Sequence, residues 1–295
     1  MSKITLLLMS EKGLSVLREV LSSFDPEIID FIVIGSDKNV VKDYSEEIQN
    51  LAQKHKIRTF KRNAIYQIKS KYAIAISWRW LINYENEQTR LIVFHDSLLP
   101  KYRGFAPLVN QLIQKEPILG VTAFLANEAF DKGAIIKQLK TNISYPIKIE
   151  EAIRKVTPLY NDLANSIIGR IVNNLELNIV AQSEEQATYS LWRDDRDYEI
   201  NWSEHAEDIQ RFINAVGFPY LGASTHIGDR TIRILDAKVE PDLCIVNRDH
   251  GKTLFSEENH VVVVCGKGLL KITQAVYDDS KESIFPLQKF RLRFL

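Results

Sequence analysis

The sequence predicts an α/β protein with two domains, a doubly wound domain over residues 1–203 and a smaller, β-rich domain over 204–295. In the first part, short continuous apolar runs alternate with helical patterns, which is typical of a parallel sheet buried on both faces. In the second part, short strand-like runs are separated by turns, which favours a small barrel or sandwich. The length of 295 residues suits two domains.

The first domain opens with an apolar run at 3–9, followed by apolar residues at helical spacing over 14–21. Further buried strands are predicted at 29–34, 72–76 and 91–94, a polar helix at 41–55, two strands around a turn at 118–126 and 134–140, and a long helix at 148–173. Pro158 should kink or split this last helix. The charged stretch 173–203 has weak periodicity and should connect the domains.

The second domain begins with a predicted helix at 204–216. Its strands are expected at 222–228, 231–239, 260–265, 268–276 and 287–294. The two cysteines, Cys244 and Cys265, form neither a disulfide framework nor a zinc motif, so we expect both to be buried apolar residues and no metal site.

Composition and charge exclude several classes of protein. With 45% hydrophobic and 26% charged residues, the chain is not expected to be disordered. The 38 basic and 38 acidic residues give a formal net charge of 0, which argues against a global attraction to nucleic acid or to an anionic membrane. The apolar run at the N-terminus is too short for a signal peptide, and no run reaches the length of a membrane span, so a cytoplasmic protein is expected.

The residues that suggest chemistry follow the predicted strand at 91–94. His95 lies at its carboxyl end, before a polar loop that contains Pro100 and Gly104, and Asp131 follows 36 residues later between two predicted strands. In doubly wound sheets, ligands bind at the carboxyl ends of the strands. A histidine there can exchange protons near neutral pH, and a carboxylate can orient it.

These motifs resemble the folate-dependent formyltransferases, a family that includes methionyl-tRNA, glycinamide ribonucleotide and sugar N-formyltransferases. The resemblance rests on His95-x-Ser97-Leu98-Leu99-Pro100-x-Tyr102-Arg103-Gly104, Gly120-Val121-Thr122 and Asp131-x-Gly133-x-Ile135. It continues through Arg193-x3-Asp197-x2-Ile200-x-Trp202 and Pro219-x-Leu221-Gly222-Ala223, near the start of the family's C-terminal domain. It therefore covers nearly the whole chain and implies a Rossmann-like formyltransferase domain followed by a barrel-like domain similar to an OB-fold.

The resemblance implies that an amine attacks the formyl carbon of 10-formyltetrahydrofolate, so that negative charge develops on the formyl oxygen. His95 would then be the acid/base and the oxyanion donor, and Asp131 its partner and proton relay. Residues expected to contact the cosubstrate are Ser77, Trp78, Arg79, Trp80, Asp131 and Gly133. Residues expected to contact the acceptor are Ser10, Lys12, Lys101, Tyr102, Arg103, Gly104 and Arg193.

One position departs from the family pattern. Two residues before the histidine, where the family has an asparagine that binds the oxyanion, this chain has Val93, and Asp96 stands where Pro or Gly is frequent. Losing an oxyanion donor costs roughly 10²–10³ in rate. Another donor replaces the asparagine, the alignment hides a small shift, or the chain no longer transfers formyl groups. The nearby polar candidates are Ser77, Ser97, Asn83 and Asn127.

The sequence favours an amino sugar over tRNA as the acceptor. Residues 204–295 hold 12 basic and 13 acidic residues, a net charge of −1, which suits phosphate binding poorly. Segment 36–43 also lacks the long Gly-rich and basic insertion that the tRNA enzymes would imply. We therefore expect a dTDP- or UDP-linked amino sugar, a role in bacterial surface-glycan (lipopolysaccharide) synthesis, and, by analogy, a homodimer formed through the C-terminal domain. The alternatives are a methionyl-tRNA formyltransferase and a catalytically silent binding protein; the sequence identifies neither the sugar, the nucleotide nor the amino position.

Overall fold

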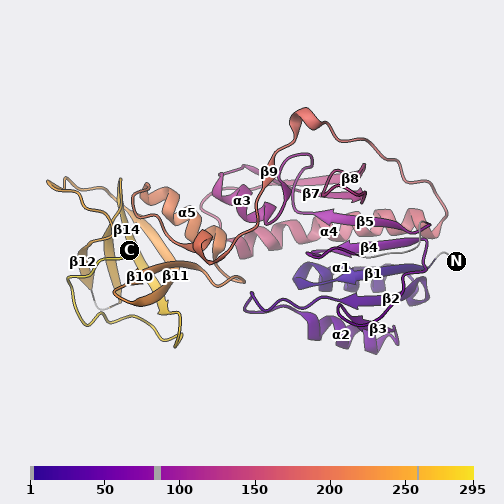
Figure 1. Ribbon diagram of the computed structural model, residues 1–295, viewed down its shortest axis with the longest axis horizontal. Coiled ribbons are helices and arrows are strands. Elements are labelled where there is room, and N and C mark those ends of the chain that lie inside the picture. The colour runs from indigo at the N-terminus through magenta and orange to yellow at the C-terminus, as the bar shows by residue number, and fades with distance from the viewer. Residues whose placement is uncertain (1–2, 83–87, 258) are drawn as a thin grey trace. The chain divides into compact units, whose positions relative to one another are not determined.

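The computed structural model describes residues 3–82, 88–257 and 259–295, and the chain divides into two compact units (Figure 1). The first unit comprises residues 1–108, 117–143 and 152–191, and the second comprises 109–116, 144–151 and 192–295. Residues 192–203, which the sequence assigned to the end of the first domain, thus group with the C-terminal part of the chain.

A seven-stranded sheet forms the centre of the first unit (Figure 1). Its strands are β1 (Ile4–Leu8), β2 (Ile29–Ile34), β3 (Thr59–Lys61), β4 (Tyr72–Ile76), β5 (Arg90–His95), β7 (Ile118–Leu125) and β8 (Ile135–Asn142). They lie in the order β3-β2-β1-β4-β5-β7-β8. The first five strands in this order are parallel to one another, β7 is antiparallel to β5, and β8 is antiparallel to β7. The predicted α/β class is confirmed, and β3, which is only three residues long, was missed by the pattern.

The strand order reverses between β1 and β4. From β1 the chain builds outward through β2 and β3, and it then returns to place β4 on the other side of β1, with Leu8 opposite Ile76. All five residues of β1 and all five of β4 are buried, as expected for strands covered on both faces. The crevice at the carboxyl ends of two such strands is where an open α/β sheet binds ligands.

The helices of the first part of the chain are α1 (Ser10–Ser23), α2 (Ser45–Lys54), α3 (Pro107–Ile113) and α4 (Ile149–Val172). α2 begins at Ser45 rather than at residue 41, because Tyr44 has a left-handed φ of 62°, which a right-handed helix cannot contain. The Asp43 carboxylate accepts hydrogen bonds from the Ser45 backbone N–H and hydroxyl at this start. The expectation that Pro158 splits α4 was wrong, since the helix continues through it. Proline has no backbone N–H, so the Arg154 carbonyl loses its helical partner. Both residues are exposed, so water can satisfy this carbonyl.

Short elements complete this part of the chain. A two-residue parallel pair joins β6 (Arg103–Gly104) to β9 (Tyr189–Ser190). Single turns of 3-10 helix occur at Pro26–Ile28, Glu184–Gln186 and Asp195–Tyr198. The second of these turns lies in the segment that the sequence showed only as weakly patterned.

The second unit holds helix α5 (Ala206–Val216) and a five-stranded antiparallel sheet. The strands are β10 (Ala223–Ile227), β11 (Arg230–Glu240), β12 (Thr253–Glu257), β13 (His260–Val264) and β14 (Leu269–Tyr277), in the order β10-β11-β14-β13-β12. The expected strand at 287–294 is not regular, and β12 was not expected. The chain end nevertheless joins both edges, because Leu292 accepts from Thr253 N at 3.1 Å and Leu295 exchanges two backbone hydrogen bonds with His226 at 3.0 Å. These bonds support the barrel-like expectation.

The two cysteines differ in their surroundings. Cys265 is fully buried, as expected, and burial raises the pKa of its thiol to about 12. Cys244 is exposed, in the loop between β11 and β12, so the expectation that it is a buried apolar residue was wrong. A search of the described residues finds no helix with the length and apolar character needed to cross a membrane.

Candidate active site

His95 is the last residue of β5 and is only 7% exposed. Its Nε2 lies 2.7 Å from the carbonyl oxygen of Tyr102, which can only accept a hydrogen bond. This contact indicates that Nε2 carries the ring proton, and it leaves Nδ1 as the basic nitrogen of the neutral imidazole.

Asp131 lies beside the basic nitrogen of this histidine. One carboxylate oxygen, Oδ2, is 3.7 Å from His95 Nδ1 and accepts a hydrogen bond of 2.8 Å from the backbone N–H of Gly104. The Asp131 backbone has a φ of 53°, in the left-handed region that, apart from glycine, asparagine and aspartate adopt most often. The turn thus aims a carboxylate at the imidazole, and the structure brings together the two residues that the sequence pattern paired.

The loop between His95 and Gly104 is fixed by internal hydrogen bonds. The Ser97 hydroxyl donates to the Lys101 carbonyl at 2.6 Å, and Thr122 Oγ1 on β7 donates to the Ser97 carbonyl while accepting from Leu99 N. Gln138 on β8 donates to the Leu99 carbonyl. Each turn of the loop is therefore tied to the neighbouring strands, which explains why the Ser and Thr positions of the motif are buried.

Two glycines of the motifs have packing reasons to be glycine. A Cβ at Gly133 would lie 1.6 Å from the Leu125 carbonyl oxygen, and one at Gly104, whose φ is 102°, would lie 2.4 Å from the Ser190 carbonyl oxygen. Both residues allow the chain to approach its own backbone. The structure thus gives Gly133 a role in the turn beside Asp131, where the sequence suggested an approach to a ligand.

The structure gives Arg103 a structural role in place of the expected contact with the acceptor. It is 1% exposed, and its guanidinium donates to Gln182 Oε1 at 3.0 and 2.9 Å, to Glu184 Oε2 at 2.9 Å and to Tyr189 Oη at 3.3 Å. The hydrogen bond with Arg103 is the main cause that lowers the pKa of the Glu184 carboxyl. With its donors used in this way, Arg103 is not available to a diphosphate.

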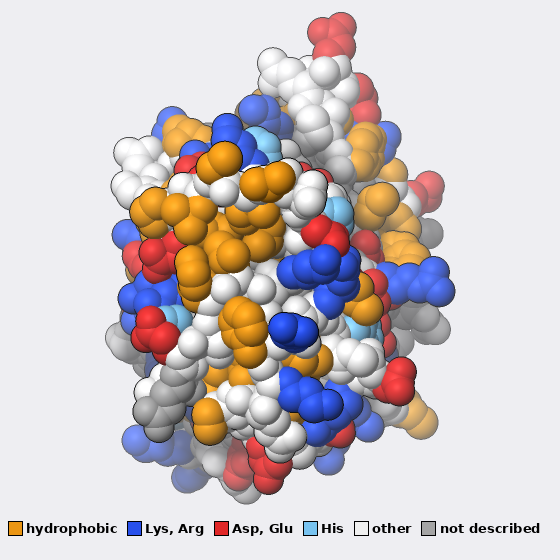
Figure 2. Space-filling model, turned by 90° about the vertical axis from the view of Figure 1, so that its left-hand side faces the viewer, with side chains coloured by type: hydrophobic (Ala, Val, Ile, Leu, Met, Phe, Trp, Pro, Cys, Tyr) orange, Lys and Arg blue, Asp and Glu red, His pale blue; other side chains and the backbone are white. Residues whose placement is uncertain are grey.

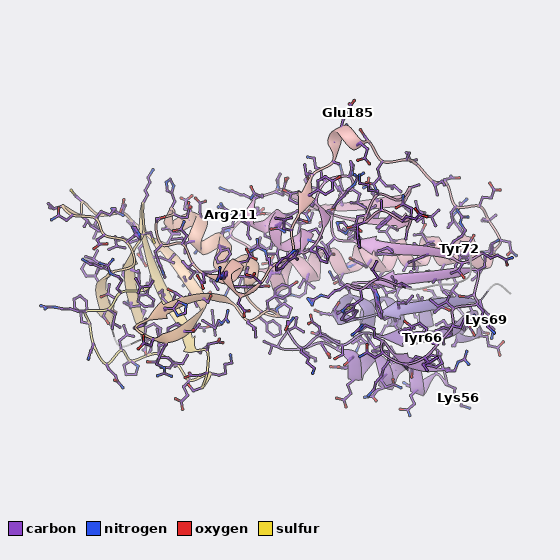
Figure 3. All side chains as sticks on the ribbon, viewed as in Figure 1. Lys56, Tyr66, Lys69, Tyr72, Glu185 and Arg211 are labelled. Carbon is purple, nitrogen blue, oxygen red and sulfur yellow. The ribbon has the colours of Figure 1, made fainter. Side chains whose placement is uncertain are left out.

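The partners of Arg103 belong to residues 180–190, which we call the clip segment. Its backbone pairs with both loops of the site: Val180 exchanges two hydrogen bonds of 2.8 Å with Ile135, and Thr188 O accepts from Arg103 N at 2.9 Å. The outer end of the segment, near Glu185, points away from the sheet (Figure 3). No motif marked the clip segment in the sequence, because its side chains contact residues that lie more than 45 positions earlier in the chain.

Two loop residues beside Arg103 reach the surface. Lys101 is exposed, and Tyr102 is half-buried with a φ of 59°. Arg193 lies in the second unit, where it donates to the Asp197 carbonyl at 3.0 Å and to Asn110 Oδ1 at 2.8 Å. Its guanidinium thus stabilises the turn in its own charged run.

Lys12 lies in the first turn of α1, and its side chain is 9% exposed. Its ammonium pairs with the carboxylate of Asp96, which also accepts from Tyr160 Oη on α4 at 2.8 Å. The residue that follows the candidate catalytic histidine is therefore anchored to two helices. This explains the aspartate at the position where the family often has Pro or Gly, and it shows that the Lys12 ammonium already has a partner.

Three buried polar atoms at the carboxyl ends of β1 and β4 have no hydrogen-bond partner among the described residues: Ser10 Oγ, Ser77 Oγ and Trp78 Nε1. Trp78 and Trp80 make an edge contact with ring centroids 5.4 Å apart, and both lie against Gly35. Arg79 pairs with Asp37 at 2.6 Å. A buried polar group without a partner costs free energy, so these atoms mark a place where a polar ligand would be stabilised.

Val93 packs against an apolar cluster that includes Ala75 and Leu91, so its side chain offers no donor. Among the candidates for the missing donor, Ser97 donates to Lys101, and Asn127 Oδ1 caps Ala129 N. Asn83 lies outside the described residues. Ser77 is the candidate whose hydroxyl is buried and has no partner in the described chain.

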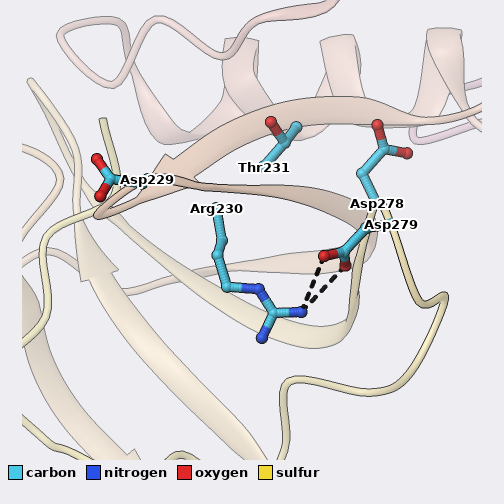
Figure 4. Close-up of a pocket in the computed structure, with 5 residues that line it drawn as sticks. All are labelled: Asp229, Arg230, Thr231, Asp278 and Asp279. Atoms are coloured by element: carbon cyan, nitrogen blue, oxygen red, sulfur yellow. Dashed lines mark hydrogen bonds and ion pairs between the residues drawn. The ribbon is translucent and has the colours of Figure 1, made fainter.

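A pocket of about 290 Å³ lies in the second unit, lined by Asp229, Arg230, Thr231, Asp278 and Asp279 (Figure 4). Arg230 Nη2 is 3.0 Å from Asp279 Oδ1, and its guanidinium stacks on Tyr277 at 3.4 Å. Asp278, also in the lining, pairs with Arg233 and Lys281. Across the described ranges, no three His, Cys, Asp or Glu side chains are placed to hold a metal ion.

Comparisons with known proteins agree with this geometry. The profile described as "Formyl transferase" matches residues 40–163, which include His95 and Asp131, and "Formyl transferase, C-terminal domain" matches residues 194–284. A methionyl-tRNA formyltransferase of Syntrophomonas wolfei is 28% identical over 245 residues, 80% of this chain and 75% of that protein. Methionyl-tRNA formyltransferases of Marinobacter nauticus and Kosmotoga olearia match over only 59% of their own lengths.

Two solved structures resemble the chain over nearly its full length. WlaRD, a sugar 3N-formyltransferase crystallised with dTDP and 5-N-formyl-THF, has a TM-score of 0.69 at 19% identity and covers 93% of this chain and 98% of its own. The N-formyltransferase of Helicobacter canadensis, in complex with folinic acid and dTDP-3-aminofucose, has a TM-score of 0.68 at 18% identity and covers 93% and 100%. With family profiles that match both of its domains and a fold shared over nearly its whole length, the chain belongs to the formyltransferase family of enzymes.

Proposed function

We propose that this protein transfers the formyl group of 10-formyltetrahydrofolate to the amino group of a nucleotide-linked amino sugar. The chemistry is supported by the His95–Asp131 pair at the carboxyl end of β5. The choice of a sugar as acceptor is supported by the charges of the second unit.

His95 acts as the base. Because Nε2–H donates to the Tyr102 carbonyl, Nδ1 keeps its lone pair and can take a proton from the attacking amine. The burial of the ring excludes most water from around this nitrogen. In its protonated form, the imidazole can donate a hydrogen bond from Nδ1 to an oxygen that gains negative charge.

Asp131 stabilises the protonated imidazole. Its carboxylate lies 3.7 Å from Nδ1, close enough to receive a proton from this nitrogen through a small movement or one water molecule. The Gly104 N–H holds the carboxylate by a charge-assisted hydrogen bond, so the orientation of Asp131 does not depend on the ligand.

The residues at the carboxyl ends of β1 and β4 fit a polar heterocycle. Ser10, Ser77 and Trp78 each bring a buried polar atom without a partner in the described chain, and such atoms require a ligand or water. The segment Ser77–Trp80 would hold the pterin of 10-formyltetrahydrofolate, which supplies the formyl group. Ser77 is then the residue best suited to replace the family asparagine as an oxyanion donor.

The observation that carries the choice of acceptor is the pairing of cations in the second unit. Of the 12 basic residues in 204–295, seven form ion pairs with aspartates of the same unit. These are Arg211, Arg230, Arg233, Arg248, Lys252, Lys281 and Arg293. A surface that grips tRNA needs unpaired cations to replace the counterions of the phosphates, and this unit has a net charge of −1 over those residues.

The comparisons lend the same proposal partial support. In structure, the two sugar enzymes match 93% of this chain with TM-scores of 0.69 and 0.68, whereas a methionyl-tRNA formyltransferase from Clostridium thermocellum matches 81% with a TM-score of 0.59. A dTDP-linked sugar is the acceptor class we favour, with Lys101 and Tyr102 as the loop residues placed to meet it. By the same analogy, we place the enzyme in bacterial surface-glycan synthesis in the cytoplasm.

A homodimer is part of the proposal. Several large hydrophobic side chains of the second unit are exposed, among them Leu243 at 47%, Val246 at 93%, Phe255 at 51% and Phe290 at 51%. Figure 2 shows hydrophobic side chains gathered over part of one face of the molecule. Contact between two copies would cover such side chains, and sedimentation equilibrium of the full chain tests it.

A panel assay tests the acceptor. The protein is mixed with 10-formyltetrahydrofolate and either dTDP- and UDP-linked amino sugars or charged initiator tRNA, and the release of tetrahydrofolate is followed. We expect turnover with at least one amino sugar and none with tRNA. Turnover with tRNA alone would establish the methionyl-tRNA enzyme, which the 28% identity to the Syntrophomonas wolfei protein favours. Ligand binding without any turnover would establish the silent binding protein that Val93 suggests.

A further inference from the structure

We propose that Gln182, in the clip segment, is a positioning residue that sets the Asp131 carboxylate against His95. The effect that we expect on kcat rests on the proposed formyl transfer, but the effect that we expect on the surroundings of His95 does not. Gln182 lies 51 positions after Asp131, in a stretch without a motif, and its side chain is partly buried between the two loops of the site.

The amide nitrogen of Gln182 holds the turn that carries Asp131. Nε2 donates to the Asp131 carbonyl at 2.8 Å and to the Gly133 carbonyl at 2.7 Å, so both N–H groups are used on one turn. This turn contains the left-handed φ of 53° at Asp131, a backbone conformation that a residue with a side chain keeps when its surroundings hold it.

The amide oxygen of Gln182 holds the other loop. Oε1 accepts from Arg103 Nε at 3.0 Å and from Nη2 at 2.9 Å. Arg103 lies between Tyr102, whose carbonyl accepts from His95 Nε2, and Gly104, whose N–H donates to Asp131 Oδ2. One amide therefore connects the backbone that orients the imidazole with the backbone that carries its carboxylate partner.

Only an amide satisfies both sides of this arrangement. A guanidinium can only donate and a carbonyl can only accept, so the oxygen must face Arg103 and the nitrogen must face the turn. Glutamate in the same place could still pair with Arg103, but its second oxygen would face two carbonyl oxygens. Gln182→Glu therefore keeps the contact with Arg103 and breaks the contact with the turn that carries Asp131.

Gln186→Glu is the matched control. It makes the same chemical change four residues further along the clip segment, at an exposed side chain of the 3-10 turn Glu184–Gln186. With saturating cosubstrate and acceptor, Q182E should lower kcat by roughly 10- to 100-fold, the loss that follows from misplacing a catalytic group by about 1 Å. The KM values should stay within about twofold, since no ligand contact is removed. Q186E should match the wild type.

A double-mutant cycle identifies the residue through which Gln182 acts. In an Asp131→Asn background, Q182E should cost less than about twofold in kcat, because the carboxylate that Gln182 positions is already gone. Gln182→Met, which keeps the side-chain length but neither donor nor acceptor, should behave like Q182E in both backgrounds. An equal loss from Q182E with and without Asp131 would overturn the proposal.

A measurement on the protein without ligands separates this proposal from the proposed function. The ¹⁵N resonances of the His95 ring, assigned by their loss in His95→Gln, should move in both Q182E and D131N and stay in place in Q186E. If the wild type transfers no formyl group but these resonances move, the function fails and the positioning stands. If the enzyme is active and the resonances stay in place in Q182E, the positioning fails and the function stands.

Discussion

Lys12 and Asp96 lie 84 positions apart in the chain and form a largely buried ion pair, in which the lysine side chain is 9% exposed and the aspartate side chain 17%. The pair ties the first turn of α1 to the residue after His95, and Tyr160 on α4 adds a hydrogen bond of 2.8 Å. The first residue of the loop that carries the active-site motif is therefore held in place by an ion pair and a hydrogen bond.

Replacing Lys12 by methionine should destabilise the fold, because it leaves the Asp96 carboxylate buried without its cation. We expect a loss of about 3 kcal/mol in the free energy of unfolding and a Tm lower by about 6 °C or more. The double variant Lys12→Met/Asp96→Leu should recover much of this loss. Calorimetry of the three proteins is the measurement, and an unchanged Tm in K12M would show that the pair contributes nothing.

Asp131→Asn should leave the fold intact and remove most of the activity. Asparagine tolerates the left-handed φ of 53° and can accept from Gly104 N, but it cannot stabilise a protonated His95. In another His–carboxylate pair the same change costs about 10⁴ in kcat, so we expect a loss of at least about 100-fold here. Initial rates beside Tm values test it, and a variant that retains more than about a tenth of the rate would remove Asp131 from the mechanism.

Ser77→Ala should lower the activity without lowering the stability of the fold. The Ser77 hydroxyl is buried and has no partner in the described chain, so its removal should leave the Tm unchanged or slightly raise it. If this hydroxyl replaces the family asparagine as the oxyanion donor, kcat should fall by roughly 100-fold. Ser97→Ala, which breaks the hydrogen bond to Lys101, is the control and should lower the Tm. A full rate in S77A would exclude Ser77 as the oxyanion donor and leave Asn83 and Asn127 as the candidates.

Asp278 should make the second unit sensitive to acid. Its hydrogen bond with Arg233 is the first cause of a pKa lowered to about 2, against about 3.9 for an unfolded aspartate. Because the folded pKa is the lower one, the stabilisation by this pair is present above pH 4 and is lost as the pH falls towards 2. The difference in unfolding free energy between the wild type and Asp278→Asn, measured from pH 7 to pH 2, should shrink over that window. A constant difference would contradict this assignment.

Local patterns predicted the parts of the fold that depend on local burial. The strands at Ile4–Leu8, Ile29–Ile34 and Tyr72–Ile76 are short runs with at most one polar residue each apart from Tyr72, and each lies where the sequence placed it. The end of the second unit was predicted as a strand at 287–294, but residues 292–295 form only a few backbone hydrogen bonds with the edges of the sheet and no regular strand.

Some residues of the candidate site could be predicted from local motifs and others could not. His95 and Asp131 are visible in the sequence because a motif surrounds each of them. Gln182 is not, since its function depends on two carbonyls and a guanidinium that come from distant segments. Arg103 and Lys12 were assigned to ligands from the family resemblance and from their positions after predicted strands, and the structure pairs them with Glu184 and Asp96.

The central claim is that the His95–Asp131 pair drives formyl transfer to an amino sugar. The most direct measurement is the release of tetrahydrofolate from 10-formyltetrahydrofolate with a panel of dTDP- and UDP-linked amino sugars, by the wild type and by His95→Asn. We expect turnover with a dTDP-linked amino sugar and a loss of at least about 100-fold in the variant. Equal rates in the two proteins, or turnover only with charged initiator tRNA, would contradict the account.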